Sequence, residues 1–256
     1  MISVSGKKWE QKKIDQNLVE KLKQDFDFND ILSRLIISRK FNEDEITTIN
    51  NNLDLNNVFL KNDDFEKSIE LVSNSINNRE YICILGDYDV DGATSSALLK
   101  RFLDHVGGTI QVIIPDRIKD GYGPNTKALL KLREEGTAVV VTVDCGTTSF
   151  EPLEAAMDAG LDVIVVDHHE AEASLPNAVA VINPNRLDDA SPHGQLAAVG
   201  VTFLLIVAVN RALRIAGWYT ERSEPDLMQW LDLVALGTVC DVVPLKGVNR
   251  ALVTQG

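Results

Sequence analysis

Three carboxylates stand at alternate positions in residues 86–92, which read Gly-Asp-Tyr-Asp-Val-Asp-Gly. Because side chains alternate along an extended chain, Asp87, Asp89 and Asp91 are expected to lie on one side of it. Like charges this close repel one another, and removing them from water costs further free energy. A bound divalent cation would remove that cost, so the spacing predicts a metal site.

The same spacing opens the calcium-binding loop of an EF-hand, and a plain acidic turn has the same composition. Counted from Asp87, the loop position that needs a bidentate Glu falls on Leu98. The segment also follows a predicted strand, whereas an EF-hand loop follows a helix. An EF-hand is therefore disfavoured, and an acidic turn without function stays open for this motif alone.

Two more predicted strands end in metal-binding side chains, at Asp144 and at Asp167-His168-His169. The carboxyl ends of parallel strands share one edge of a sheet, where α/β proteins bind ligands. A single strand-end Asp is most often a helix cap, but three such ends together favour a site. Adjacent side chains of an extended segment face opposite ways. We therefore expect one histidine to bind metal and the other to face substrate or a neighbour of the ligands.

Asp241 stands among apolar residues after a predicted helix. A carboxylate in such surroundings is costly unless it is paired or bound to metal, so it is a further candidate ligand. Oxygen-rich ligation with one imidazole suits Mn²⁺ or Mg²⁺ better than zinc or copper. Two such ions about 3.5–4 Å apart, bridged by one carboxylate, would activate water and hold a scissile phosphate. These side chains predict metal-dependent hydrolysis of phosphate esters.

The elements that position these groups follow from the hydrophobic pattern after residue 80. Short runs rich in Val and Ile alternate with helical stretches, which predicts an α/β fold with a parallel sheet flanked by helices. The predicted strands are 81–85, 109–114, 138–143, 162–166 and 179–182. The predicted helices are 93–106, 125–135, 150–159, 197–216 and 226–238.

Residues 1–78 differ in texture, because asparagines recur there and apolar residues follow helical spacing. We interpret them as a small helical N-terminal segment that precedes a catalytic domain over 79–256. The helices predicted in this segment are 17–26, 28–38, 43–50 and 64–77.

Composition narrows the class of protein. The chain has 256 residues, 45% of them hydrophobic, which is enough for a full core. Its formal net charge of -13 disfavours a plain nucleic-acid-binding module more than it disfavours a metal nuclease, since phosphate contacts rest on Lys and Arg. The three cysteines form no Cys-x-x-Cys pair, and neither a signal peptide nor a membrane-spanning run is found. We therefore expect a cytoplasmic protein with no membrane partner.

Taken in order, these motifs resemble the DHH phosphoesterase superfamily, whose Asp-His-His signature is Asp167-His168-His169 here. The similarity is close to its branch of bacterial exonucleases, which degrade single-stranded DNA from the 5′ end. It covers nearly the whole chain. It includes residues 86–92, 144–146 and 237–245, Ile-Pro-Asp-Arg at 114–117, Gly-Tyr-Gly at 121–123 and Asn-Pro at 183–184.

The resemblance implies a two-ion site of Mn²⁺ or Mg²⁺. The implied metal ligands are Asp87, Asp89, Asp91, Asp144, His168 and Asp241. One ion would be held by Asp91, Asp144, His168 and Asp241. The second would be held by Asp89 and Asp144, with Asp87 nearby, so that Asp144 bridges the two.

The resemblance also implies roles toward the phosphate. The implied catalytic residues are Asp87, Asp144 and His169, and His169 would position or stabilise the phosphate. Asp167 would belong to the ligand shell or orient a neighbour from a buried position. Arg117 and Arg186 are candidate phosphate contacts, and a solvated surface charge is the alternative for each.

Members of that exonuclease branch continue with a DHHA1-type substrate-binding domain and an oligonucleotide-binding barrel. No Gly-Gly-Gly-His motif is present in this sequence, so we expect both domains to be absent and contacts with single-stranded DNA to lie mainly in them. Long strands should then be degraded weakly or not at all. Two alternatives stay open: a phosphodiesterase or phosphatase for small nucleotides such as nanoRNA or cyclic dinucleotides, and a non-catalytic metal-binding module.

Overall fold

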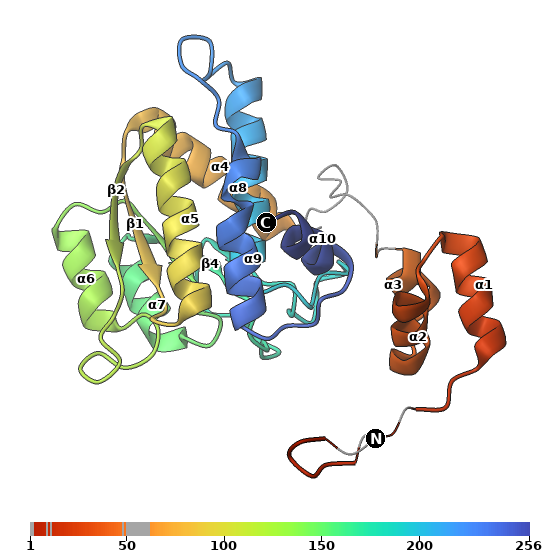
Figure 1. Ribbon diagram of the computed structural model, residues 1–256. Coiled ribbons are helices and arrows are strands. Elements are labelled where there is room, and N and C mark those ends of the chain that lie inside the picture. Colours follow the sequence, from red (N-terminus) through yellow and green to blue (C-terminus); the bar gives the residue numbers. More distant parts are fainter. Residues whose placement is uncertain (1–2, 9, 11, 48, 50–61) are drawn as a thin grey trace. The chain divides into compact units, whose positions relative to one another are not determined.

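The computed structural model describes residues 3–8, 10, 12–47, 49 and 62–256 (Figure 1). The chain divides into two compact units, Met1–Asn51 and Asn52–Gly256. The first contains helices α1 (Gln16–Phe26), α2 (Asp30–Arg39) and α3 (Glu43–Thr47). These confirm helices predicted near the same positions. The predicted helix over 43–50 extends into residues 48 and 50, which lie outside the described residues.

The second unit is built on a parallel sheet with the strand order β2-β1-β3-β4-β5. The strands are β1 (Tyr81–Gly86), β2 (Thr109–Ile113), β3 (Val139–Val143), β4 (Asp162–Val166) and β5 (Ala180–Ile182). All four neighbouring pairs are parallel, with Gly86 of β1 opposite Val143 of β3. The strand order reverses between β1 and β3, which is where open α/β sheets bind ligands at the carboxyl ends of the strands.

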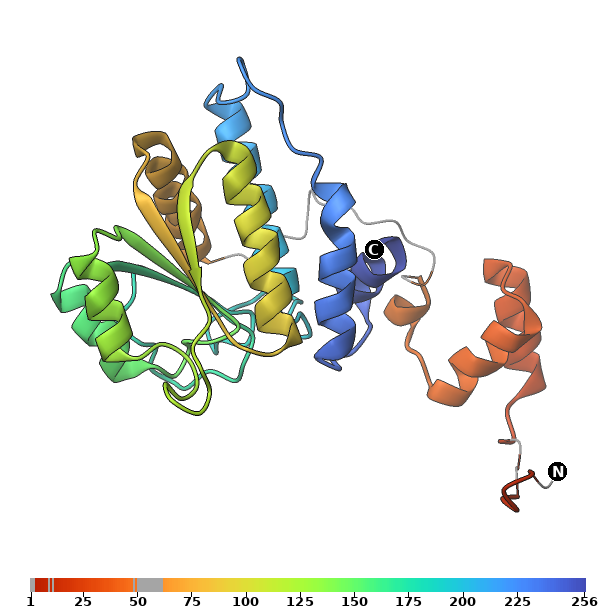
Figure 2. The ribbon, with the colours of Figure 1, turned by 60° about the vertical axis from the view of Figure 1, so that its left-hand side comes forward.

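Helices cover both faces of this sheet (Figures 1 and 2). Alternate residues of β1 divide between two cores: Ile82 and Ile84 join the larger one, Cys83 and Leu85 the smaller. The larger core contains residues of α4 (Asp63–Asn78), α5 (Val90–Val106), α8 (Ala198–Ile215), α9 (Leu231–Cys240) and α10 (Gly247–Gln255). The smaller contains residues of α6 (Thr126–Glu134) and α7 (Phe150–Asp158). A short 3-10 helix, η2 (Leu227–Trp230), precedes α9.

This architecture confirms the predicted fold class. Each predicted strand is present to within one residue at either end. Helix α8 is long and apolar enough to cross a membrane, but 78% of it is buried inside the protein. Such burial is expected of a core helix packed beside a sheet.

The compact units divide at a different place from the predicted boundary at 78/79. Helix α4 packs with the sheet unit, since Phe65, Val72 and Ile76 are buried in the larger core. Its Asp64 also accepts a hydrogen bond from the backbone N–H of Val181 in β5, at 3.1 Å. Helical periodicity shows that α4 has an apolar face but does not show which core covers that face.

Candidate metal centre

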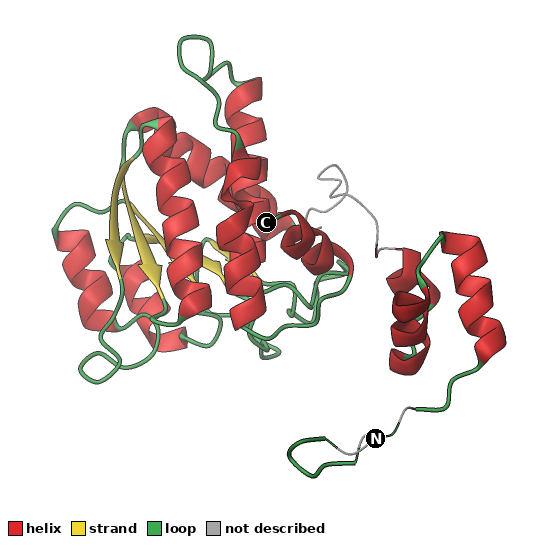
Figure 3. Ribbon diagram, in the orientation of Figure 1, coloured by secondary structure: helices red, strands yellow, loops and turns green. Residues whose placement is uncertain are grey.

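The first group of carboxylates belongs to the segment that joins β1 to α5. Loops gather at the carboxyl ends of the strands (Figure 3). Asp89 caps α5 by accepting a hydrogen bond from the N–H of Gly92, at 3.0 Å. The segment is not extended throughout, because α5 begins at Val90. Asp87 therefore directly follows a strand, Asp89 caps a helix and Asp91 lies in its first turn. This corrects the expected extended arrangement.

The turn requires a glycine at position 92. A Cβ there would lie 2.5 Å from the carbonyl oxygen of Asp87, closer than real Cβ atoms come to backbone. Gly92 thus packs directly on the backbone of Asp87. Asp87 and the neighbouring Asp91 are both buried, with exposed fractions of 5% and 1%. The Asp87, Asp89 and Asp144 carboxylates offer oxygens that lie within 4.8 Å of one another.

Asp91 also binds the start of another helix. Its two carboxylate oxygens accept hydrogen bonds from the N–H groups of Ala198 and Val199, at 2.7 and 2.8 Å. Helix α8 has no side-chain cap at its own N-cap position, Ala197, so Asp91 supplies the cap from α5. Burial raises the pKa of Asp91 to about 6, and the bonds from these amides oppose the shift.

Asp144 lies at the centre of the candidate site. Its φ is 63°, a left-handed conformation that Asp adopts more readily than most residues. Its backbone N–H donates to the carbonyl of Val166, and its own carbonyl accepts from the Tyr122 hydroxyl at 3.1 Å. Burial, reinforced by the charges of Asp91 and Asp89, raises the pKa of Asp144 to about 10.

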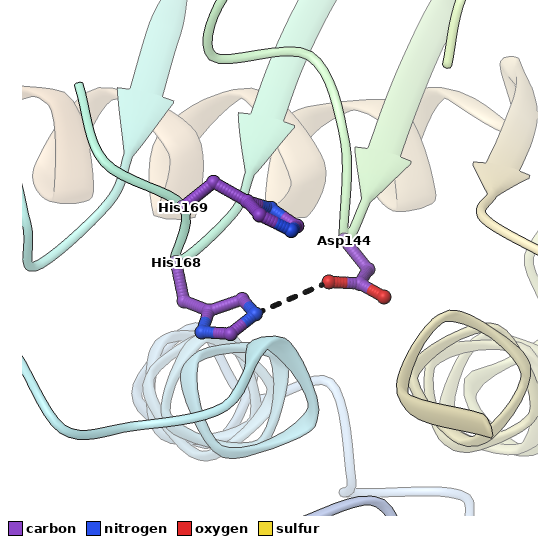
Figure 4. Close-up of side chains that lie close together, drawn as sticks. All are labelled: Asp144, His168 and His169. Atoms are coloured by element: carbon purple, nitrogen blue, oxygen red, sulfur yellow. Dashed lines mark ion pairs between the residues drawn. The ribbon is translucent and has the colours of Figure 1, made fainter. Parts of the chain in front are cut away.

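The imidazole of His168 lies among three carboxylates. Its Nε2 is 3.4 Å from Asp144 Oδ1, the contact drawn in Figure 4. It is 3.7 Å from Asp91 Oδ2 and 3.6 Å from Asp241 Oδ2. Asp241 reaches this position as the C-cap residue of α9, and burial raises the pKa of its carboxyl.

His169 is paired differently. Its Nδ1 lies 2.7 Å from Oδ1 of the buried Asp167, which also accepts from the N–H groups of Thr147 and His168. The hydrogen bond to Asp167 raises the pKa of His169 despite the opposing effect of burial. Burial works against ionisation of Asp167, but its bonds from His169 and Thr147 prevail and hold its pKa below the usual range.

The two histidines do not face opposite ways as predicted. Their ring centroids are 4.7 Å apart, and both rings point toward Asp144 (Figure 4). The chain leaves the regular strand geometry after Val166, so strict alternation no longer applies. Their surroundings still differ: His168 lies among the carboxylates, whereas the His169 side chain is 49% exposed.

These side chains fit divalent cations. Four buried polar atoms of the site have no hydrogen-bond partner among the described residues: Asp87 Oδ1, Asp144 Oδ1, His168 Nε2 and Asp241 Oδ2. Buried polar atoms in native proteins nearly always have a partner. Overlapping groups of potential ligands converge around these atoms: Asp91, His168 and Asp241; Asp87, Asp89 and Asp144; Asp144, His168 and His169. Carboxylates with imidazole nitrogen suit Mn²⁺ or Mg²⁺.

The two predicted phosphate contacts differ in availability. Arg117 is exposed and lies over the ring of Tyr88, with its Cζ 5.0 Å from the ring centroid. Arg186 has a side chain that is 8% exposed and donates to Asp64 and to the Val181 carbonyl, both at 2.7 Å, and also to Asp188. Its donors therefore tie α4 to β5 within the protein, and its role as a phosphate contact stays a prediction.

Several polar residues that were not among the predicted site residues hold the two histidines in place. Asn183 donates to the His169 carbonyl at 2.8 Å and to the Thr147 hydroxyl at 3.0 Å. Asn185 donates to the carbonyl of His168. Asn-Pro at 183–184 was part of the family resemblance, but nothing in the sequence singled out Thr147 or Asn185.

Comparison with known proteins bears on this site. The N-terminal domain of the DHH family matches residues 81–238. The single-stranded-DNA-specific exonuclease RecJ of Dickeya dadantii is 44% identical over 193 residues, which is 74% of this chain and 34% of that protein. RecJ of Bacillus subtilis is 33% identical over 98% of this chain and 31% of its own length. The chain thus spans about a third of the curated relatives it matches.

Solved structures of RecJ are similar to this chain in fold. A crystal structure of exonuclease RecJ bound to manganese superposes with a TM-score of 0.68 at 33% identity, over 80% of this chain and 49% of that one. RecJ of Thermus thermophilus in complex with Mn²⁺ gives a TM-score of 0.73 at 26% identity, over 94% of this chain and 33% of that one. Matched by the family's domain model over residues 81–238 and by solved relatives in fold, the chain belongs to the DHH family.

Proposed function

We propose that this chain is the catalytic core of a metal-dependent phosphodiesterase, a 5′-to-3′ exonuclease acting on single-stranded DNA. The observation that carries this proposal is the set of four buried ligand atoms without hydrogen-bond partners in the described chain, which converge at the switch point of the sheet. The substrate follows from the relatives, which are named single-stranded-DNA-specific exonucleases. Solved relatives hold Mn²⁺ or Mg²⁺.

The ligand groups define two neighbouring positions. Asp91, His168 and Asp241 would hold one ion, and Asp87 and Asp89 would hold the other. Asp144 would serve both, since its Oδ1 lies 3.4 Å from His168 Nε2 and its carboxylate also groups with Asp87 and Asp89. Bound there, the ions would generate a water nucleophile at neutral pH and neutralise charge on the scissile phosphate.

His169 and Arg117 would contact the phosphate directly, and Asp167 would orient His169. Asp167 holds the Nδ1 side of His169, so Nε2 of that ring is left to donate to a phosphate oxygen. The raised pKa of His169 favours the imidazolium, which stabilises developing negative charge. Arg117, exposed beside Tyr88, would contact a phosphate of the strand.

The proposed setting is the cytoplasm. Cys83 and Cys145 are buried free thiols and Cys240 is an exposed one. Free thiols suit a reducing compartment.

The test compares three substrates with Mn²⁺ present: a short 5′-phosphorylated oligonucleotide, a dinucleotide and pyrophosphate. Mononucleotide release from the 5′ end of the oligonucleotide, abolished by a chelator, supports the proposal. Hydrolysis of the dinucleotide alone favours a small-nucleotide phosphodiesterase. Mn²⁺ binding without hydrolysis of any substrate favours a non-catalytic module. A control variant is Asp162→Asn, which alters a carboxylate at the opposite end of β4 from the candidate site. It should hydrolyse the same substrate at the rate of the unmodified chain.

A further inference from the structure

Helix α10 carries a fully buried amide, Asn249, whose exposed fraction is 0%. Its Nδ2 donates to the carbonyl of Pro244 at 3.1 Å and to the carbonyl of Gln195. Pro244 lies in the segment that leaves α9, and Gln195 lies in the segment that enters α8. A single side chain therefore joins two segments that are far apart in the sequence.

Each of these segments carries one side of the candidate metal centre. Pro244 is three residues after Asp241. Gln195 is three residues before Ala198, whose N–H holds the Asp91 carboxylate. Asp241 and Asp91 flank the same nitrogen, His168 Nε2, at 3.6 and 3.7 Å. The amide of Asn249 thus holds the two segments that position Asp241 and Asp91, and so influences the distance between these two carboxylates without bonding to either.

The backbone beside Asp241 needs such a hold. Val242 has a φ of 62°, and the residue is 85% exposed. A β-branched residue in this left-handed conformation is strained and persists only where its surroundings impose it. The Pro244 carbonyl, held by both Asn249 and the N–H of Lys246, is one point where the surroundings act on this segment.

We propose that Asn249 is a positioning residue that sets the spacing of the Asp91–His168–Asp241 ligand group. The inference rests on the proposed function in one respect, that this group holds a divalent cation. Asn249 lies outside residues 81–238, the part matched by the DHH domain. Its amide NH₂ acts on the ligands through two backbone carbonyls.

The test counts Mn²⁺ ions by equilibrium binding and by electron paramagnetic resonance, which distinguishes a spin-coupled pair of ions from an isolated one. We expect the unmodified chain to bind a coupled pair. In Asn249→Ala, one ion should bind about 10- to 100-fold more weakly, the usual loss when an outer partner of a metal ligand is removed, and the spectrum should become that of an isolated ion.

The matched control is Asn210→Ala. Asn210 is 3% exposed, donates to Glu224 and accepts from the Tyr219 hydroxyl, so it is a buried, hydrogen-bonded asparagine on α8. This control should keep both ions at unchanged affinity. Because Asn249 acts on Asp241, the double variant Asp241→Asn with Asn249→Ala should lose no more affinity than Asp241→Asn alone.

Two results overturn the positioning role alone: a coupled pair at unchanged affinity in Asn249→Ala, or equal weakening in Asn210→Ala. Failure of the unmodified chain to bind a pair overturns the proposed function as well. If Asn249→Ala does not fold, Asn249→Leu, which keeps the number and branching of the side-chain heavy atoms and removes the donor, replaces it. Loss of a cooperative thermal transition in both would make Asn249 a purely structural residue.

Discussion

At the scale of single residues, the site gathers buried carboxylates whose oxygens are not all satisfied by the protein groups that the structure describes. Asp144 is 2% exposed, and burial raises its pKa to about 10. Asp87 and Asp241 each present a buried oxygen without a hydrogen-bond partner in the described part of the chain. Without a cation these groups oppose folding, because each would be buried either charged and unpaired or neutral and unsatisfied. The carboxylates that would bind the metal ions therefore destabilise the fold when no metal is bound.

Asp144→Asn tests that opposition. Asn tolerates the left-handed φ of this position and removes the carboxylate shared by both ion positions. In the presence of a chelator we expect the free energy of unfolding to rise by about 1–3 kcal/mol, since the penalty for burying this carboxyl, whether ionised or protonated, is lost. Hydrolysis should fall by more than about 100-fold, beyond the loss caused by removing an outer partner. Urea unfolding in chelator and initial rates in Mn²⁺ measure the two effects. A less stable variant in chelator contradicts the argument.

Asp167→Asn should change the pH dependence of catalysis. Asp167 raises the pKa of His169, so the imidazolium persists to higher pH than it would in water, and its stabilising pair is lost as pH rises through that raised pKa. Replacing the carboxylate by a neutral amide removes the negative charge beside His169 and so lowers the pKa of His169. The alkaline limb of the rate profile should therefore move to lower pH, measured between about pH 5 and 9. An unmoved limb with an unchanged metal content would show that His169 does not act as a cation.

At the scale of elements, periodicity located the strands well because most of them are apolar on both faces and bounded by turns. It misplaced the start of α5, predicted at residue 93, since Asp89 caps a helix that starts at Val90. It assigned α4 to the wrong side of the predicted boundary, because the core that covers an amphipathic helix depends on tertiary contacts. The partners of Arg186 and Asn249 that are distant in the sequence also could not be predicted from periodicity.

Gly237 allows α9 to approach α5 and α8 closely. A Cβ at this position would lie 2.3 Å from Thr94 Oγ1 and 2.8 Å from Val199 Cγ1. Gly237→Ala should therefore push α9 away and carry Asp241 from His168. We expect a loss of about 1–3 kcal/mol in stability, typical of overpacking, and weaker Mn²⁺ binding measured by titration.

Thr94→Ala provides the matched test of this contact. It removes the oxygen that the added methyl would meet first, so the double variant should regain part of the stability and of the Mn²⁺ affinity. Equal losses in the single and double variants would mean that α9 does not shift through this contact.

At the scale of the whole molecule, the chain divides into two compact units, and the candidate ligands named above all belong to the second. The second unit contains both hydrophobic cores and the full sheet. A variant that begins at Asn62 should therefore fold and bind Mn²⁺ with the affinity of the full chain. Circular dichroism and Mn²⁺ titration check this, and a loss of binding by the folded variant would contradict it.

The net negative charge of the whole chain should weaken its binding to a long DNA strand. It carries 25 Lys and Arg against 38 Asp and Glu, and phosphate binding depends on the cations. In the proposed exonuclease, the metal centre and exposed arginines such as Arg117 would have to hold the strand. We expect hydrolysis of a short 5′-phosphorylated oligonucleotide to be distributive, and lengthening the strand should leave KM nearly unchanged. An excess of unlabelled strand, added after initiation, should stop product release at once. Sustained degradation of long strands under that trap would show that this chain carries a strand-binding surface of its own.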